Sequence, residues 1–115
     1  MIDFACKKFS LQEVIKCGLG LSKSEYKLLS FLLMKPKSYS SVKLSSSLHL
    51  DLSTVQRAVK NLFEKDLVIR SQENLDNGGY VFNYSVKNKE EIKKMIMEVI
   101  TGWCKKVEGE LESWA

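Results

Sequence analysis

The sequence predicts a mainly α-helical fold of the α+β class, with five helices and one two-stranded β-hairpin. Apolar residues recur at every third or fourth position through most of the chain, which is the period of a helix with one buried face. The period shortens to two on both sides of "DNGG" (Asp76 to Gly79), a turn sequence that commonly joins two antiparallel strands. A length of 115 residues suits a single hydrophobic core.

The first two helices are expected from their end signals. The stretch "FSLQEVIKCG" predicts a short helix that ends when Gly18 takes a left-handed conformation. The second helix is expected to begin after Ser22, because the Ser22 side chain and Glu25 have the spacing of a capping box. Pro36 should end it, because the residue before a proline disfavours helical angles.

The next two helices are joined by a short link and predict a helix-turn-helix. The first runs from about Ser41 to Leu48, and the second occupies "STVQRAVKNLF". We expect Ser53 to cap the second helix, with Gln56 as its capping-box partner. The predicted core-facing residues of this helix are Val55, Ala58, Val59, Leu62 and Phe63.

A hairpin and a long last helix complete the predicted fold. The strands are expected from Val68 to Glu73 and from Gly79 to Val86, with Tyr80, Phe82 and Tyr84 on one face of the second strand. The last helix carries an apolar stripe formed by Ile92, Ile96, Val99, Trp103, Val107, Leu111 and Trp114. The stripe either folds back on the core of its own chain or, as we predict, pairs with a second copy to form a homodimer.

The order of these elements is that of a winged helix-turn-helix, in which the hairpin is the wing. The segments "GLSKSEYKLLSFLL", "LSTVQRAVKNLFEKDLVIR" and "DNGGYVFNYSV" resemble the winged-helix domains of MarR-like and TrmB-like transcription regulators, especially small archaeal members. The resemblance implies that the second helix of the motif enters the DNA major groove, the wing follows the backbone or minor groove, and the terminal helices form the dimer. The sequence departs from the family pattern at Ser45, Ser46 and Ser47, where small apolar residues are usual, and at His49, where glycine is common.

The resemblance divides the chain into three segments with different expected roles. Residues 1–18 form an N-terminal helix that supports the dimer or core, residues 19–88 form the DNA-binding domain, and residues 89–115 form the dimerisation helix. The candidate DNA contacts of the reading helix are Ser53, Thr54, Gln56, Arg57, Lys60 and Asn61. Those of the wing and its flank are Lys43, Arg70, Asn74, Asn77 and Gly78.

The side chains of the reading helix suit different parts of DNA. Arg57 can bind guanine in bidentate fashion, and Gln56 can bind adenine. Lys60 is better suited to a phosphate contact. Gln56 has two alternatives, since a capping-box partner would bend back toward Ser53 instead of reaching a base.

The charge distribution permits a polyanionic partner without requiring one. The net charge is +4, and the balance is +5 in residues 1–50, zero in residues 51–88 and −1 in residues 89–115. Four acidic residues of the middle segment would repel phosphate if they faced it: Glu64, Asp66, Glu73 and Asp76. The alternative function is therefore a winged-helix module for protein–protein interaction, or a small subunit of a larger assembly.

Catalytic, cofactor, metal and membrane functions are not expected. His49 is the only histidine, and its spacing from Cys6, Cys17 and Cys104 matches no known metal-ligand pattern. The unpaired spacing of the cysteines indicates reduced thiols, buried as small hydrophobes, in a cytoplasmic protein. No apolar run approaches the roughly 18 residues of a membrane span. We predict sequence-specific binding of double-stranded DNA by a homodimer that regulates transcription, with no effector named by the sequence.

Overall fold

Residues 1–115 are all described by the computed structural model, and they divide into two units. Unit 1 combines Met1–Leu21 with Glu90–Ala115, whereas unit 2 is the continuous segment Ser22–Lys89. None of the helices combines the length and the apolar composition that crossing a bilayer requires.

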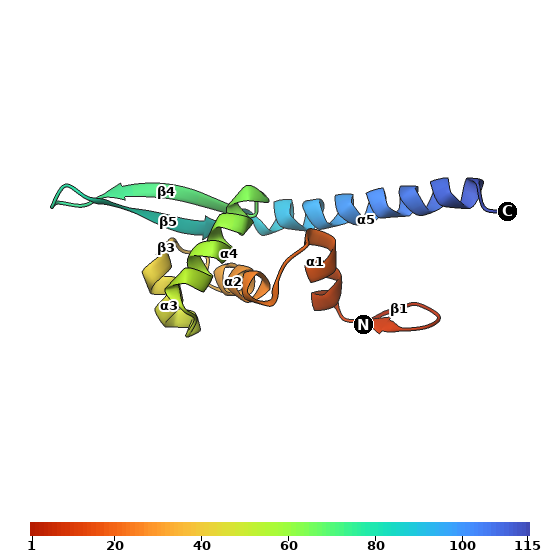
Figure 1. Ribbon diagram of the computed structural model, residues 1–115, viewed down its shortest axis with the longest axis horizontal. Helices are drawn as coiled ribbons and strands as arrows, with labels where there is room; N and C mark the ends of the chain where they lie inside the picture. The colour runs from red at the N-terminus through yellow and green to blue at the C-terminus, as the bar shows by residue number, and fades with distance from the viewer. The chain divides into compact units, whose positions relative to one another are not determined.

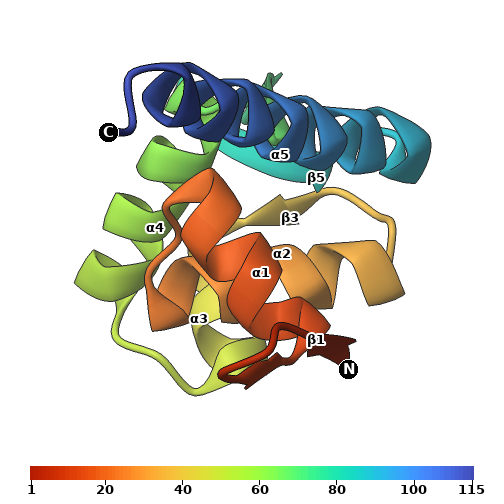
Figure 2. The ribbon, with the colours of Figure 1, turned by 90° about the vertical axis from the view of Figure 1, so that its right-hand side faces the viewer.

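Three helices form the core of unit 2: α2 (Lys23–Met34), α3 (Ser41–Leu48) and α4 (Leu52–Glu64) (Figure 2). They confirm the predicted helix-turn-helix and the helix that precedes it. The largest fully buried side chains are Leu28, Leu29, Leu32, Leu44, Val55, Val59, Leu62, Leu67 and Val68. All of these side chains belong to unit 2, so α4 is held by one buried face and keeps its opposite face outward.

The wing is a long antiparallel hairpin of β4 (Val68–Asn74) and β5 (Tyr80–Val86). It confirms the predicted turn, and Figure 1 shows it extending beyond α3 and α4. A third strand, β3 (Tyr39–Ser40), pairs with β5 and gives the sheet the order β3-β5-β4. The sequence prediction had only two strands, because a strand of two residues is too short to show an alternating pattern.

The start of α4 differs from the prediction. Asp51 is the N-cap, with the extended backbone angles of that position, and its side chain makes no capping hydrogen bond. Ser53 therefore lies inside the first turn, and the predicted capping box with Gln56 is wrong. In α2 the capping box is confirmed, because the backbone N–H of Glu25 donates to Ser22 Oγ at 3.2 Å and the N–H of Ser22 donates to Glu25 Oε1 at 3.4 Å.

The structure shows the consequences of both departures from the family pattern, in α3 and in its link to α4. His49 has a φ of 54°, the left-handed conformation that favours glycine and that histidine adopts at a cost. The Ser45 hydroxyl donates to the carbonyl oxygen of Leu50 and so ties α3 to the turn. Ser46 and Ser47 face solvent, so replacing small apolar residues there removes nothing from the core.

Unit 1 contains a short hairpin and two helices. The hairpin of β1 (Ile2–Asp3) and β2 (Lys8–Phe9) was not predicted. Helix α1 (Leu11–Leu19) runs through Gly18 and ends at Gly20, whose φ of 66° supplies the left-handed cap that had been expected of Gly18. Gly18 lies instead against the last helix, since a Cβ atom built there would be 3.9 Å from Val99 Cγ1.

The last helix, α5 (Lys89–Glu112), has 24 residues and a length of about 36 Å. Ile92, the first residue of its apolar stripe, is buried, with 3% of its surface exposed. The stripe is exposed from Val99 onward, and Trp103 reaches 56% exposure. Trp114, at 78% exposure, lies just beyond the end of the helix.

Candidate nucleic-acid interface

The outward face of α4 presents polar and basic side chains in unit 2. Gln56, Arg57 and Lys60 are exposed, and so is Ser53. Thr54 is half-buried at the edge of this face. Because the capping box is absent, the Gln56 amide is not held by its own helix end and remains available for an external partner.

The Asn61 side chain binds Glu25 of α2 and is not part of this exposed face. Its Nδ2 donates to Glu25 Oε2 at 3.0 Å, and Lys65 Nζ lies 3.5 Å from Glu25 Oε1. Burial alone would raise the pKa of Glu25. The hydrogen bonds from Asn61 and from the Ser22 backbone, together with the charge of Lys65, outweigh burial and hold that pKa below its ordinary value. This contact with Glu25 contradicts the prediction that Asn61 binds DNA.

The face of the wing that carries the three aromatic residues is buried only at its base. Tyr84 is buried and Phe82 is half-buried, whereas Tyr80 is 60% exposed. The rings of Tyr80 and Phe82 lie edge to face, with centroids 5.4 Å apart. This face therefore changes from core packing at its base to an exposed aromatic surface toward the tip.

Phe63 was predicted to face the core, but it is 37% exposed. It follows Val55 by eight residues, which turns it about 80° around the helix away from Val55. Its ring lies beneath the Arg70 guanidinium, with Arg70 Cζ 4.6 Å from the ring centroid. Arg70 Cζ is also 4.5 Å from the ring centroid of Phe82.

These ring contacts of Arg70 were missed at the level of sequence. The register of the hairpin places Arg70 opposite Tyr84 and Gln72 opposite Phe82, so Arg70 and Phe82 are diagonal neighbours. Counting pairs outward from the "DNGG" turn would have indicated this proximity. Nothing local in the sequence indicates that Phe63 joins them.

A hollow of about 280 Å³ opens between the start of α3, α4 and β5. It is lined by Ser40, Ser41, Val42, Gln56, Tyr80, Val81, Phe82 and Tyr84. Gln56 is the only α4 residue in this lining. The hollow thus brings a predicted base-reading residue beside the aromatic face of the wing.

The wing tip is shaped by its own side chains. Gly78 has a φ of 90°, a conformation that favours glycine. Asn77 Oδ1 accepts from the backbone N–H of Gly79 at 3.2 Å, and Asn74 Oδ1 accepts from Gln72 Nε2 at 3.2 Å. All of these residues are exposed, so Asn74 and Asn77 combine a role in the turn with accessibility.

Two of the four acidic residues that would oppose DNA are engaged within unit 2. Asp66 Oδ1 lies 4.0 Å from Lys87 Nζ, and Glu73 Oε2 accepts from Asn83 Nδ2 at 2.9 Å. Strand alternation also places Glu73 on the face of the wing opposite Arg70. Lys43, in the first turn of α3, is exposed and adds a positive charge at the start of that helix.

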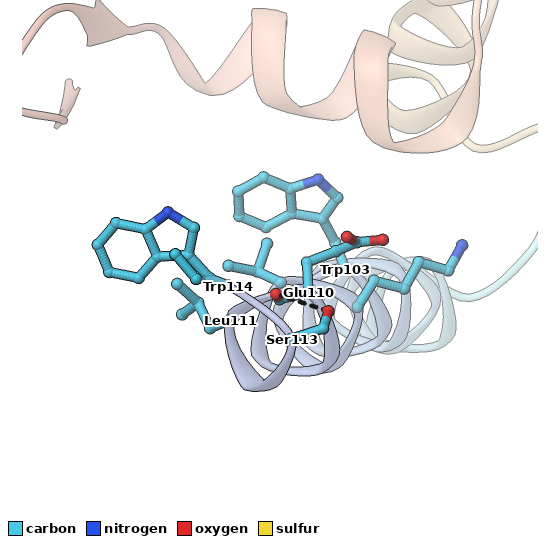
Figure 3. A pocket seen from close by; sticks show the side chains of 8 residues that line it. Trp103, Glu110, Leu111, Ser113 and Trp114 are labelled. Carbon is cyan, nitrogen blue, oxygen red and sulfur yellow. Dashed lines mark hydrogen bonds between the residues drawn. The ribbon is translucent and has the colours of Figure 1, made fainter.

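In unit 1, the exposed end of α5 bears a second hollow, of about 640 Å³. It is lined by Trp103, Lys106, Val107, Glu110, Leu111, Ser113, Trp114 and Ala115. Figure 3 shows both indole rings on the same side of the helix. The Ser113 hydroxyl donates to the Glu110 carbonyl oxygen at 3.2 Å and helps to close the helix end.

The cysteines are all exposed, which corrects the expectation that they are buried. They are Cys6, Cys17 and Cys104, and all three thiols are free. All belong to unit 1. No group of three or more histidine, cysteine, aspartate or glutamate side chains is arranged to hold a metal ion.

Comparison with known proteins identifies a family and a set of fold neighbours. The family model of the DnaD N-terminal domain matches residues 9–107. A solved structure described as a possible transcriptional regulator from Methanosarcina mazei Go1 is 44% identical, with a TM-score of 0.94, and the match covers 99% of this chain and 96% of that one.

More distant structures share the fold. A MarR protein from Peptoclostridium difficile is 19% identical with a TM-score of 0.57, and the match covers 87% of this chain and 62% of that one. A MepR mutant from S. aureus, bound to an oligodeoxyribonucleotide, is 12% identical with a TM-score of 0.57, and covers 90% of this chain and 73% of its own. These likenesses confirm the predicted winged-helix fold, while the MarR-like and TrmB-like relationships stay predictions.

Proposed function

This chain belongs to the DnaD N-terminal domain family, and we propose that it binds double-stranded DNA in a sequence-specific manner as a homodimer and regulates transcription. One observation carries the proposal: the exposed face of α4 presents Gln56, Arg57 and Lys60 beside a long wing of the same unit. The MepR neighbour, which was crystallised with DNA, supports the choice of partner. A cytoplasmic location suits the three free, exposed thiols.

In this proposal α4 lies in the major groove and the wing lies along the backbone or minor groove. Arg57 binds guanine O6 and N7, and Gln56, which does not cap its helix, binds adenine. Ser53, Thr54, Lys60 and Lys43 contact phosphates from the two helices of the motif. Asn74, Asn77 and Gly78 bring the wing tip to the DNA.

The DNA proposal is tested by selecting bound fragments from a genomic library and titrating the selected duplex at several salt concentrations. We expect Arg57→Ala to weaken binding by about 1–3 kcal/mol and to relax the preference at one base pair. Lys94→Ala is the matched control, because Lys94 is an exposed cation of α5 outside the proposed interface. Failure of the wild-type protein to retain any fragment at low salt would refute DNA binding.

The homodimer is proposed from the exposed part of the α5 stripe, which a second copy would cover. The exposed residues of this proposed interface are Val99, Trp103, Val107, Leu111 and Trp114, and the half-buried Ile96 lies at its edge. Two-fold symmetry would then bring two copies of α4 to half-sites about one DNA turn apart, in a pseudo-palindromic site. Ile92 was also predicted for this interface, but it is buried within its own chain and leaves no surface for a second copy to cover.

Analytical sedimentation tests the dimer proposal, because it measures whether the protein in solution has the mass of one chain or of two. We expect the wild type to sediment as a dimer at micromolar concentration and Trp103→Glu to sediment near the 13.2 kDa of one chain. Thr101→Glu is the control, because Thr101 is exposed on the opposite side of α5 and should leave the mass unchanged. A monomeric wild type would overturn the proposal.

A protein–protein interaction module is the second candidate, and the zero charge balance of residues 51–88 favours it. A surface that holds a polyanion usually carries net positive charge. The two candidates differ in salt dependence, because counterion release makes DNA affinity fall steeply as salt rises. Stable association with a protein partner, together with no duplex binding, would select the second candidate.

A further inference from the structure

Arg70 is the one arginine of the wing, and its guanidinium is held by aromatic rings from two other elements. Arg70 Cζ lies 4.6 Å from the ring centroid of Phe63 in α4 and 4.5 Å from that of Phe82 in β5. Arg70 is nevertheless an exposed residue. None of the salt bridges of the chain includes it, so its positive charge is not neutralised by a carboxylate.

This arrangement fixes the cation without using its hydrogen-bond donors. A guanidinium over aromatic rings is held through its π face, and its five N–H donors lie in the plane of the group. The planar fork of donors matches the two free oxygens of a phosphodiester. Because the two ring contacts restrict the rotamers of Arg70, binding an anion should cost less rotamer freedom than it costs an exposed arginine without such contacts.

The position of Arg70 connects it with the proposed reading face. Phe82, which holds Arg70, also lines the hollow that contains Gln56. Gln56, Lys60 and Phe63 succeed one another at spacings of four and three residues, so they share one side of α4. The Arg70 cation therefore belongs to the border between α4 and the wing, on the side where Lys60 is exposed.

We propose that Phe63 and Phe82 are positioning residues that hold the guanidinium of Arg70, which the sequence already predicted as a DNA contact of the wing, in place for a phosphodiester. The inference rests on the proposed function, because it names a phosphate-binding element of the same DNA-binding surface. It differs from a purely structural role, in which the stack would only fasten the wing to α4. A structural role predicts a loss of stability without a change in the number of phosphate contacts.

The test is a set of duplex titrations over a range of salt concentrations with the full chain. Each phosphate contact adds about 0.9 to the steepness of log K against log salt. We expect Arg70→Gln to reduce that steepness by about 0.9 for each protomer on the duplex. Lys94→Gln removes an equal charge from α5 and should leave it unchanged. An unchanged steepness in Arg70→Gln would overturn the inference while the proposed function stands.

Phe82→Leu separates the positioning role from the charge. This variant keeps Arg70 but removes one ring contact, so we expect affinity to fall about two- to fivefold with the salt dependence of the wild type. Unchanged affinity would refute the positioning role. Thermal unfolding identifies the folded temperature range of each variant. If Arg70→Gln is unfolded at the assay temperature, Arg70→Lys replaces it and should show weaker binding with the full salt dependence.

The outcomes distinguish the two proposals. A wild-type protein that binds no duplex at low salt refutes the proposed function and the inference together. A wild-type protein that binds, with Arg70 variants that match it in affinity and salt dependence, refutes the inference alone.

Discussion

Glu25 provides a sharp test of how unit 2 is held together. Glu25 is 7% exposed, and its carboxylate accepts hydrogen bonds from Asn61 Nδ2 at 3.0 Å and from the Ser22 backbone at 3.4 Å. It therefore joins the first turn of α2 to the last turn of α4. The change Glu25→Gln keeps the size of the side chain but removes the charge that these donors and Lys65 favour.

The expected loss is about 1–2 kcal/mol at neutral pH. A hydrogen bond to a charged group contributes about 1.5–3 kcal/mol, and glutamine retains part of it through its carbonyl oxygen. The Lys65 ion pair adds little, because the Lys65 side chain is partly exposed and water screens the pair. For a domain of about 60–100 residues, the size range of unit 2, each kcal/mol shifts the melting temperature by about 4–8 °C.

The pH dependence of this loss follows from the lowered pKa of Glu25. A carboxyl with a lower pKa in the folded state contributes stability that is fully present above its unfolded pKa, and the contribution disappears as pH falls through the folded value. The difference in melting temperature between wild type and Glu25→Gln should therefore be largest at neutral pH and shrink below about pH 4.

Circular dichroism melts from pH 7 to pH 3 measure this difference directly. Glu64→Gln is the matched control, since Glu64 is an exposed carboxylate of α4 and its change should stay within about 0.5 kcal/mol. A Glu25→Gln protein with wild-type stability at pH 7, or a difference that does not shrink with acid, would refute the role assigned to this carboxylate.

Two further changes test the core and the turn. Leu62→Ala should cost about 2–5 kcal/mol of unfolding free energy, because Leu62 is fully buried. Leu75→Ala is the control and should cost far less, because Leu75 is exposed and lies outside the proposed dimer interface. Urea unfolding measures both losses, and equal losses would contradict the assigned core. His49→Gly should raise the free energy of unfolding by about 0.5–1 kcal/mol, because glycine adopts the left-handed conformation of this position without strain. His49→Ala is the control, because it keeps a Cβ atom and should gain nothing. A thermal melt in which His49→Gly is no more stable than the wild type would show that His49 is not strained.

The predictable parts of the fold are those whose signals are local. The capping pair Ser22 and Glu25 lies within one helical turn, and the "DNGG" turn contains its own conformational requirement. The α4 residues Val55 and Leu62 repeat at helical spacing and are both fully buried. Local chemistry was ambiguous at the start of α4, where Asp51 and Ser53 are both good capping residues and only the backbone decides between them.

The unpredicted parts depend on contacts between distant segments. Strand β3 forms because Tyr39 and Ser40 pair with residues of β5. A segment of two residues is too short for its sequence to predict such pairing. The Arg70 stack requires Phe63 and Phe82, which come from a helix and a returning strand. The orientation of Asn61 likewise depends on Glu25 of another helix, so a residue predicted for the outer face is half-buried and bound within the fold.

The division of the chain into two units has a consequence for the order in which it can assemble. Unit 2 is one uninterrupted segment, so all of its partners are present before α5 emerges from a ribosome. Unit 1 joins segments from both sides of unit 2, and its contact between Gly18 and Val99 closes a loop that contains the whole winged helix. Closing that loop costs chain entropy, so we expect the wing and its three helices to fold first and α1 to meet α5 later.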